Sequence, residues 1–201
     1  FYFFFISLIV SFSIYMQIGK TNLINTVLVA SSLYLFIVTT KDFFSKELYN
    51  FSKKISHFGF SLLILSILLN AIFSSEAIFN VKVGEKFTFK NEKILFKSLV
   101  KRQKENYQSV IGNFTIEDEK KSISMFKPEL RIYEQPLVVT SEADIKTTLF
   151  KDEFLVMNKI KGNEYFNVRY QVKPFMIWIW ISTVLIAIGG FLSLYNRVYE
   201  K

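Results

Sequence analysis

The stretch ISHFGFSLLILSILLNAIF, from Ile55 to Phe73, contains nineteen residues and no charged side chain. An α-helix rises about 1.5 Å per residue, so this length matches the roughly 30 Å thickness of the hydrocarbon core of a bilayer. Lysines at positions 53 and 54 precede the stretch, and a glutamate at position 76 follows it. We therefore predict a membrane-spanning helix here, with the other segments of the chain arranged on either side of it.

The predicted span contains His57, the only histidine of the chain. The chain has no cysteine, so His57 is also its only strong soft-metal or imidazole-type ligand. An ionisable side chain inside a span is costly to bury and marks a candidate functional site. The alternative is a histidine near a helix end that reaches interfacial water or a serine hydroxyl. Position alone leaves both interpretations open.

Three further uncharged stretches predict three more spans. Residues 1–18 and 23–40 are joined by only four residues, which indicates an antiparallel helical hairpin. Residues 175–195 form the last predicted span, and its early tryptophans fit the aromatic belt at a membrane–water interface. Gly189 and Gly190 give this span a smooth patch, so we expect the pair to face another helix.

The segment 41–54 is polar, but Phe44, Leu48 and Phe51 recur in it at helical spacing. This pattern predicts either an interfacial helix that leads into the third span or a loop whose phenylalanines enter the bilayer. The two interpretations stay open.

Lysines and arginines near the spans predict the orientation of the chain. The segment 41–54 carries four lysines, and the C-terminal tail carries Arg197 and Lys201, whereas the turn 19–22 carries one lysine. With four spans, the segment 41–54 and the C-terminal tail lie on the same side of the membrane. The positive-inside rule identifies this side as the cytoplasmic (or matrix) side. The long segment between the third and fourth spans would then lie on the outer face.

That long segment, residues 76–172, is rich in β-forming residues. Apolar and polar side chains alternate over Val81–Phe89 and again over Phe166–Val172. Period-two alternation with short strands predicts an antiparallel sheet, in the form of a small sandwich or barrel. We therefore predict a polytopic α-helical membrane protein with three spans in 1–75, an outer-face β domain in 76–172, and a final span and tail in 173–201.

Composition narrows the function classes. Of the 201 residues 51% are hydrophobic, which is too apolar for an ordinary soluble domain. The net charge of +8 is spread among acidic residues, so we expect no nucleic-acid partner. The absence of cysteine excludes a disulfide framework and a thiol nucleophile. Because Phe1 already lies in an apolar run, we expect the chain to be the C-terminal piece of a longer protein.

Several short motifs follow one another in a fixed order over Ser56–Val198. They are His57-Phe58-Gly59, Asn106-Tyr107-Gln108, Pro128-Glu129 with Arg131 and Tyr133, Ser141-Glu142-Ala143-Asp144-Ile145, Lys173-Pro174-Phe175, Trp178-Ile179-Trp180 and Gly189-Gly190. Together they resemble the C-terminal part of the CcmF family, the heme-lyase subunit of system I for cytochrome c maturation in bacteria and mitochondria. The first two spans match this family in hydrophobicity but not in a motif.

The resemblance assigns a role to His57. In the family, two membrane-embedded histidines hold a b-type heme from opposite faces, and His57 stands at the position of one of them. The resemblance thus implies that His57 is an axial ligand of heme iron; it leaves catalytic residues unassigned. Because the chain has one histidine, the second ligand must come from an N-terminal part of the same protein or from a sister chain.

The neighbours of His57 suggest how a porphyrin would be held. Gly59 is small enough to let a flat ring approach the helix, and Phe58 or Phe60 could line the edge of the ring. Lys53 or Lys54 could meet its propionates.

The resemblance implies a component of holocytochrome c synthase in the bacterial or mitochondrial inner membrane. Heme would arrive from the chaperone CcmE on the outer face and meet an apocytochrome c, handled by its partner CcmH. The family's tryptophan-rich outer segment and outer-face histidines are not in this chain. The β domain is expected to be a scaffold or docking face, with Glu142 and Asp144 as surface or turn residues rather than catalytic acids.

Two other functions are compatible with the predicted architecture. One is a non-catalytic membrane-anchored assembly or docking module in which His57 is structural. The other is a transporter fragment, which the sequence disfavours because the predicted spans contain no acidic residue for ion coupling.

Overall fold

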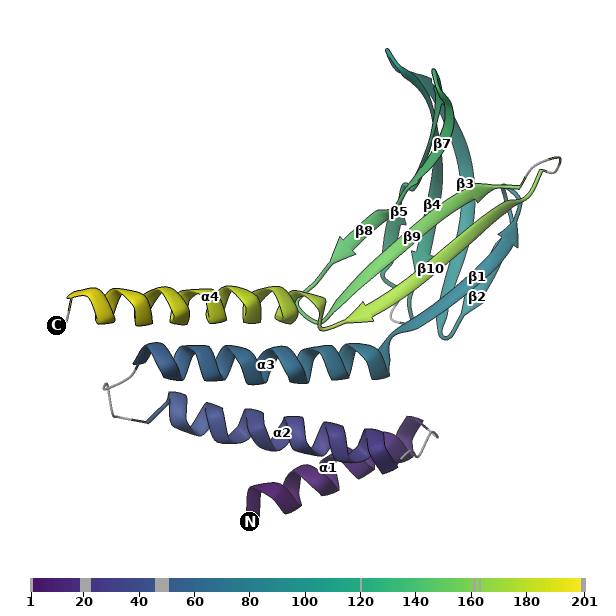
Figure 1. Cartoon of the computed structure of the whole chain (residues 1–201). Coiled ribbons are helices and arrows are strands. Elements are labelled where there is room, and N and C mark those ends of the chain that lie inside the picture. The colour runs from purple at the N-terminus through teal and green to yellow at the C-terminus, as the bar shows by residue number, and fades with distance from the viewer. Residues whose placement is uncertain are drawn as a thin grey trace. The chain divides into compact units, whose positions relative to one another are not determined.

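The computed structural model describes residues 2–18, 23–45, 51–119, 121–160, 162 and 164–199. The chain divides into two compact units. The helical unit comprises Phe1–Phe73, Leu149–Lys151 and Pro174–Lys201, and the β unit comprises Ser74–Thr148 and Asp152–Lys173. Along the chain, the β unit is therefore an insertion between the third and fourth helices (Figure 1).

The helical unit contains α1 (Tyr2–Ile18), α2 (Leu23–Phe43), α3 (Phe51–Phe73) and α4 (Met176–Tyr199). Helices α2, α3 and α4 are long and apolar enough to cross a membrane. Helix α1 is also apolar but, at 17 residues, is shorter than these three. The four predicted helices are confirmed, and three of them have the length of a span.

Contacts between α1 and α2 agree with the predicted helical hairpin. The Ser11 hydroxyl donates to the Thr26 carbonyl at 2.7 Å, and the rings of Phe4 and Tyr34 meet edge to face at 5.9 Å. The connecting residues 19–22 lie outside the described residues. So do residues 46–50, and the two interpretations of the 41–54 segment therefore stay predictions.

Within the residues that the structure describes, the β unit is built from ten strands. They are β1 (Ser75–Val81), β2 (Lys86–Phe89), β3 (Glu92–Gln103), β4 (Tyr107–Glu117), β5 (Ile123–Phe126), β6 (Glu129–Glu134), β7 (Leu137–Glu142), β8 (Asp144–Thr147), β9 (Lys151–Lys159) and β10 (Phe166–Pro174). One sheet has the order β1-β10-β9-β8, and the other has the order β2-β3-β4-β6-β7 with β5 also paired to β4. The pairs β1–β10, β3–β4, β4–β6, β6–β7 and β8–β9 are antiparallel, as predicted.

One continuous stretch of chain passes from one sheet to the other. Strand β7 pairs with β6, strand β8 pairs with β9, and only Ala143 separates β7 from β8. At this crossing the side chain of Ser141 is hydrogen-bonded to that of Asn158 on β9. The crossing joins the two sheets along one side of the β unit.

The core lies between the sheets and is rich in aromatic rings. Phe96 and Phe114 stack with ring centroids 4.3 Å apart, and Tyr170 is fully buried. The Tyr170 hydroxyl donates to Glu92 at 2.8 Å. Burial, followed by the charge of Glu153, raises the pKa of Tyr170 above its ordinary value, so this hydroxyl stays a donor.

The alternation seen in the sequence corresponds to this core. Val81 is buried, as are Phe166, Val168 and Tyr170, and the partly buried Phe87, Phe89 and Val172 pack against the same cluster. Val83 is the exception, because it lies in the turn after β1 and is 45% exposed. The prediction of an antiparallel β domain between the third and fourth helices is confirmed.

Candidate functional site

His57 lies in the second turn of α3, and its side chain is exposed. Among the described residues it has no hydrogen bond, ion pair or ring contact. The alternative interpretation allows interfacial water or a serine hydroxyl as the partner, and of these two the serine hydroxyl is not found in the part of the chain that the structure describes. The imidazole is presented outward from the helix with both ring nitrogens free of protein partners in that part.

An exposed stripe extends from His57 along α3. Phe60 and Ile67 are 53% and 48% exposed, and Ala71 is exposed as well. The intervals of three, seven and four residues keep these side chains on one side of a helix. We call His57, Phe60, Ile67 and Ala71 the His57 face.

A different face of α3 packs closely against α4. A Cβ atom added to Gly59 would lie 3.0 Å from the Leu185 Cβ, and one added to Gly189 would lie 2.2 Å from the Ser56 Oγ. Such distances are shorter than van der Waals contact, so the two glycines let the helix backbones approach. We call Ser52, Ser56, Gly59 and Gly189 the pairing seam.

The pairing seam corrects two interpretations. Gly59 is buried against α4, so it does not offer an open surface to a porphyrin. Gly189 faces a helix as predicted, but Gly190 is exposed and a Cβ added there would meet no atom within 4 Å. Residues 189 and 190 point about 100° apart around a helix, so both could not face the same neighbour.

Helix α2 occupies a further part of the α3 surface. The ring of Phe58 stacks on Phe43 at 5.0 Å and contacts Phe36 at 5.7 Å, while Ser61 shares a 2.5 Å hydrogen bond with Thr39. Phe58 is thus engaged, which leaves Phe60 as the phenylalanine available beside His57. Similarly, the Lys54 ammonium is hydrogen-bonded to Ser45, whereas Lys53 is exposed.

In the β unit, several residues of the sequence motifs come together on β4, β6 and β7. Register pairs Tyr107 with Tyr133 and Glu129 with Glu142, and the Tyr107 and Tyr133 rings lie 5.3 Å apart. The Arg131 guanidinium lies 5.3 Å from the centre of the Tyr107 ring. It also contacts Glu129 at 3.2 Å and Glu142 at 3.4 Å. We call these five residues the Arg131 cluster.

Both carboxylates of the Arg131 cluster lie beside the single guanidinium of Arg131. Burial tends to raise the pKa of Glu129, but the neighbouring Ser109 hydroxyl and the Arg131 guanidinium outweigh burial and hold this pKa below its ordinary value. Glu142 pairs with the same guanidinium, and the Asp144 carboxylate accepts the Lys127 amide at 2.6 Å. Both acids are therefore engaged in contacts within the β unit, and their assignment as surface or turn residues rather than catalytic acids stays a prediction.

Replacing Arg131 with Gln is expected to weaken the β unit in a pH-dependent way. Because the folded-state pKa of Glu129 is depressed, its stabilising contribution is present above the unfolded-chain pKa of about 4.3 and is lost as the pH falls through the folded-state value. We expect Arg131→Gln to lower the free energy of unfolding by about 1 kcal/mol at pH 7 and by less at pH 3. Pulse proteolysis in urea measures this difference on the full chain.

Arg169→Gln is the matched control. Arg169 pairs with Glu76 at 2.6 Å, but their side chains are 49% and 38% exposed, so solvent weakens the pair. Its replacement is expected to cost less at pH 7 than the replacement of Arg131. An equal loss for Arg131→Gln at both pH values would contradict the ionic origin of the effect.

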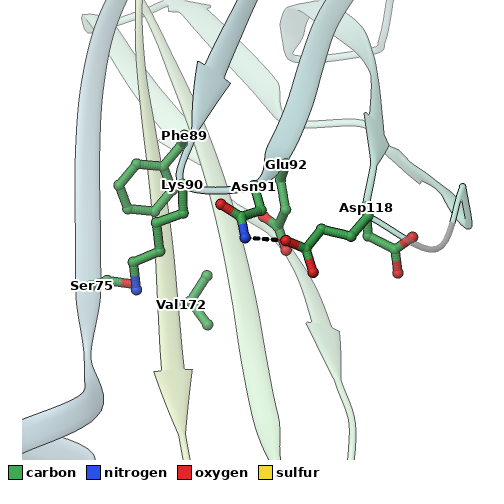
Figure 2. Close-up of a pocket in the computed structure, with 8 residues that line it drawn as sticks. Ser75, Phe89, Lys90, Asn91, Glu92, Asp118 and Val172 are labelled. Atoms are coloured by element: carbon green, nitrogen blue, oxygen red, sulfur yellow. Dashed lines mark hydrogen bonds between the residues drawn. The ribbon is translucent and has the colours of Figure 1, made fainter. Parts of the chain in front are cut away.

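A second set of polar side chains lines a hollow of about 690 Å³, and Ser75 and Val172 line the same hollow (Figure 2). The Lys90 side chain runs toward Ser75, while Glu92 and Asp118 lie on the other side. These carboxylates serve the fold: Glu92 accepts the Tyr170 hydroxyl, and Asp118 accepts the Ser122 amide at 2.8 Å. In the described parts of the chain, no three His, Cys, Asp or Glu residues are grouped so as to hold a metal ion. The hollow therefore receives no catalytic assignment.

Comparisons with known proteins agree with this architecture. A family model described as the CcmF C-terminal beta-sandwich matches residues 72–174. The cytochrome c-type biogenesis protein CcmF of Pseudomonas aeruginosa is 26% identical over 147 residues, which are 73% of this chain and 22% of that protein. The cytochrome c-type biogenesis protein ccl1 of Rhodobacter capsulatus is 29% identical over 152 residues, covering 76% of this chain and 23% of that protein.

A solved structure has the same fold. The structure named cytochrome c heme lyase CcmF superposes with a TM-score of 0.69 at 15% sequence identity, and the match covers 94% of this chain and 33% of that one. The chain thus spans less than a quarter of the length of the two relatives named above. Since the family model covers about half of the chain and takes in the β-sandwich inserted between α3 and α4, this protein belongs to the CcmF family of cytochrome c biogenesis proteins.

Proposed function

We propose that this chain is the C-terminal part of a cytochrome c maturation heme lyase and that His57 ligates the iron of a b-type heme within the membrane. The observation that carries the proposal is the exposed imidazole on α3, which has no partner among the described residues. A bound b-type heme supplies one-electron redox chemistry, while the protein supplies ligation, orientation and a low dielectric.

The residues from Lys53 to Phe60 fit a porphyrin at the His57 end of the His57 face. Phe60 offers an exposed ring one turn further along α3, and Lys53 is an exposed cation one turn earlier. An aromatic ring suits the apolar macrocycle, and an ammonium suits a propionate. The pairing seam and α2 occupy other faces of α3, so they leave this one open within the described structure.

The same proposal implies that the second axial ligand of the heme iron lies outside this chain. His57 is the only histidine, and the chain covers 22% and 23% of the relatives named above. The partner histidine would come from the N-terminal part of the same protein or from a sister chain that packs beside His57.

The alternative of a docking module with a structural histidine is less well supported. A structural histidine in a span is expected to donate or accept a hydrogen bond within the helix bundle. Of the nearby serines, Ser61 is hydrogen-bonded to Thr39, and Ser56 packs against Gly189 on another face of α3. The geometry therefore favours a binding partner for the His57 imidazole that lies outside the described residues.

The proposed partners follow from the same assignment. Heme would be delivered by CcmE and attached to an apocytochrome c whose thiols are handled by CcmH. The β unit would act as a scaffold or docking face, because the acids of the Arg131 cluster and of the Figure 2 hollow are engaged in structural contacts. The chain would therefore contribute to holocytochrome c synthase without being a complete enzyme.

A complementation experiment tests the function. In cells whose CcmF lacks this region, co-expression of the chain with the remaining part is expected to restore covalent c-type cytochromes, detected by heme staining of denaturing gels. A chain lacking residues 74–173, with α3 joined to α4 by a short linker, controls for the helices alone. Absence of maturation despite co-purification of the two parts would contradict the proposed function.

We further propose that the β unit lies on the outer face of the bacterial or mitochondrial inner membrane. Lys41, Lys53 and Lys54 flank the α2–α3 connection, and Arg197 lies at the end of α4. By the positive-inside rule, these charges support a cytoplasmic or matrix location for these helix ends. Protease added to the outer face is expected to digest the β unit and spare the α2–α3 connection. Protection of the β unit in that experiment would overturn the orientation.

A further inference from the structure

A second hollow of about 570 Å³ lies within the β unit, at the edge of the core, because Val110, Leu130 and Phe166 line the hollow and also belong to the core cluster. Its floor is formed by β3, β4, β6 and β7, and its wall by the neighbouring ends of β9 and β10. The apolar side chains that line it are Leu99, Val110, Leu130, Ile132, Val139 and Phe166. Its volume falls in the range of small-molecule binding sites, which combine an apolar lining with a few polar groups. We call it the apolar trough.

The trough exists because the two sheets differ in extent. Strands β3, β4 and β7 continue past the β9–β10 hairpin in Figure 1, so their inward faces lose the cover of the other sheet. Val139 and Leu137 lie on the same face of β7, and they are 58% and 80% exposed. The hydrogen bond between Ser141 and Asn158 closes the side of the trough at the β7–β8 crossing. The apolar floor of the trough is therefore left uncovered.

The rim of the trough is cationic. Lys101 on β3 and Lys159 at the end of β9 both line it. Neither ammonium forms an ion pair with any residue that the structure describes. No aspartate or glutamate is among the described lining residues. An apolar floor with two unpaired cations is complementary to an apolar molecule that carries a carboxylate.

We propose that the apolar trough binds an amphiphilic carboxylate, with its apolar body on Val139 and Ile132 and its carboxylate at Lys101 or Lys159. The trough crosses four adjacent strands instead of following one free edge, so its shape favours a compact small molecule over an added peptide strand. This site is separate from the proposed role of His57, and neither proposal depends on the other.

Photolabelling of the full chain in lipid nanodiscs tests the site. The probe is dodecanoic acid carrying a diazirine near its methyl end, and labelled peptides are identified by mass spectrometry. We expect labelling within 99–110 and 130–141, and a weaker signal from the dodecanol analogue. Excess oleate and excess mesoporphyrin form two competition arms, which distinguish an acyl chain from a flat dicarboxylate.

Matched variants distinguish labelling in the apolar trough from nonspecific labelling of other hydrophobic surfaces. Val139→Trp fills the trough, whereas Val138→Trp adds the same ring to the opposite face of β7, where Val138 is 44% exposed. Lys101→Glu is expected to reduce labelling about threefold to fivefold, and Arg102→Glu, on the opposite face of β3, to leave it unchanged. Equal labelling of the two tryptophan variants, or labelling confined to the helices, would overturn the proposal.

Discussion

His57→Ala is expected to reduce the b-type absorption spectrum of the reassembled protein to background and to stop cytochrome c maturation. The reason is that the substitution removes one of two axial ligands from a heme held by imidazole on both faces, as proposed above. Exogenous imidazole should fill the vacated position and partly restore both the spectrum and maturation. The measurements are the reduced-minus-oxidised spectrum of the co-purified parts and heme staining of cytochrome c.

Ile67→Ala is the control on the same face of the same helix. Ile67 is 48% exposed and lies ten residues, or about 15 Å of helix rise, beyond His57. Its truncation should leave heme content and maturation near the unchanged level. Full heme content and normal maturation in His57→Ala would falsify the ligand assignment and favour the docking-module alternative.

Gly189→Leu is expected to separate α3 from α4. The new Cβ would lie 2.8 Å from both the carbonyl oxygen of Ser52 and the amide nitrogen of Ser56, as well as 2.2 Å from the Ser56 hydroxyl. Two of these atoms belong to the backbone, so no side-chain rotation relieves the clash. We expect a loss of about 3 kcal/mol or more in the free energy of unfolding of the helical unit. The midpoint of SDS-induced unfolding and the steady-state amount in membranes measure this loss.

Gly190→Leu is the neighbouring control. A Cβ at position 190 would meet no atom within 4 Å, and the residue is exposed. Its substitution should leave the SDS midpoint unchanged, and replacement of a helix glycine is itself mildly favourable. Equal destabilisation by the two substitutions would show that steric contact along the pairing seam is not the cause.

Charge-free length and period-two alternation were sufficient to predict much of the fold. The absence of charge over Ile55–Phe73 corresponds to α3, and the alternation over Phe166–Val172 corresponds to buried side chains of β10. Both signals are local, because a span and a half-buried strand are recognised from adjacent residues. Helix α1 fits the same apolar pattern, but its 17 described helical residues make it shorter than the other spans.

The rotation of the helices could not be predicted from local patterns. The sequence indicates that Gly189 and Gly190 can approach a neighbour, but only packing against α3 shows that Gly189 does so. The same limit applies to Gly59, which the sequence made available to a porphyrin and the structure buries against Leu185. The seam depends on the angle at which two distant segments meet, and one sequence does not contain that angle.

The Arg131 cluster and the apolar trough depend on strand order. Tyr107, Arg131 and Glu142 come from three strands, and they meet because β4, β6 and β7 are neighbours in the sheet. The motifs marked these residues, but alternation alone does not fix which strands pair or in which register. The trough likewise requires two sheets of different extent, for which the apolar run Leu137–Val139 was the available signal.

The separation of the pairing seam from the His57 face bears on the order of events during biogenesis. Ser56 and Gly59 hold α3 to α4 without using His57, so the helix pair can form before any cofactor is present. The translocon can therefore release α3 and α4 into the membrane as a packed pair. The His57 imidazole is then still exposed and available to bind heme later. If the proposed function holds, cells starved of heme would accumulate the heme-free protein intact in the membrane instead of degrading it. Resupply of heme would then convert this protein to the heme-bound form without new protein synthesis.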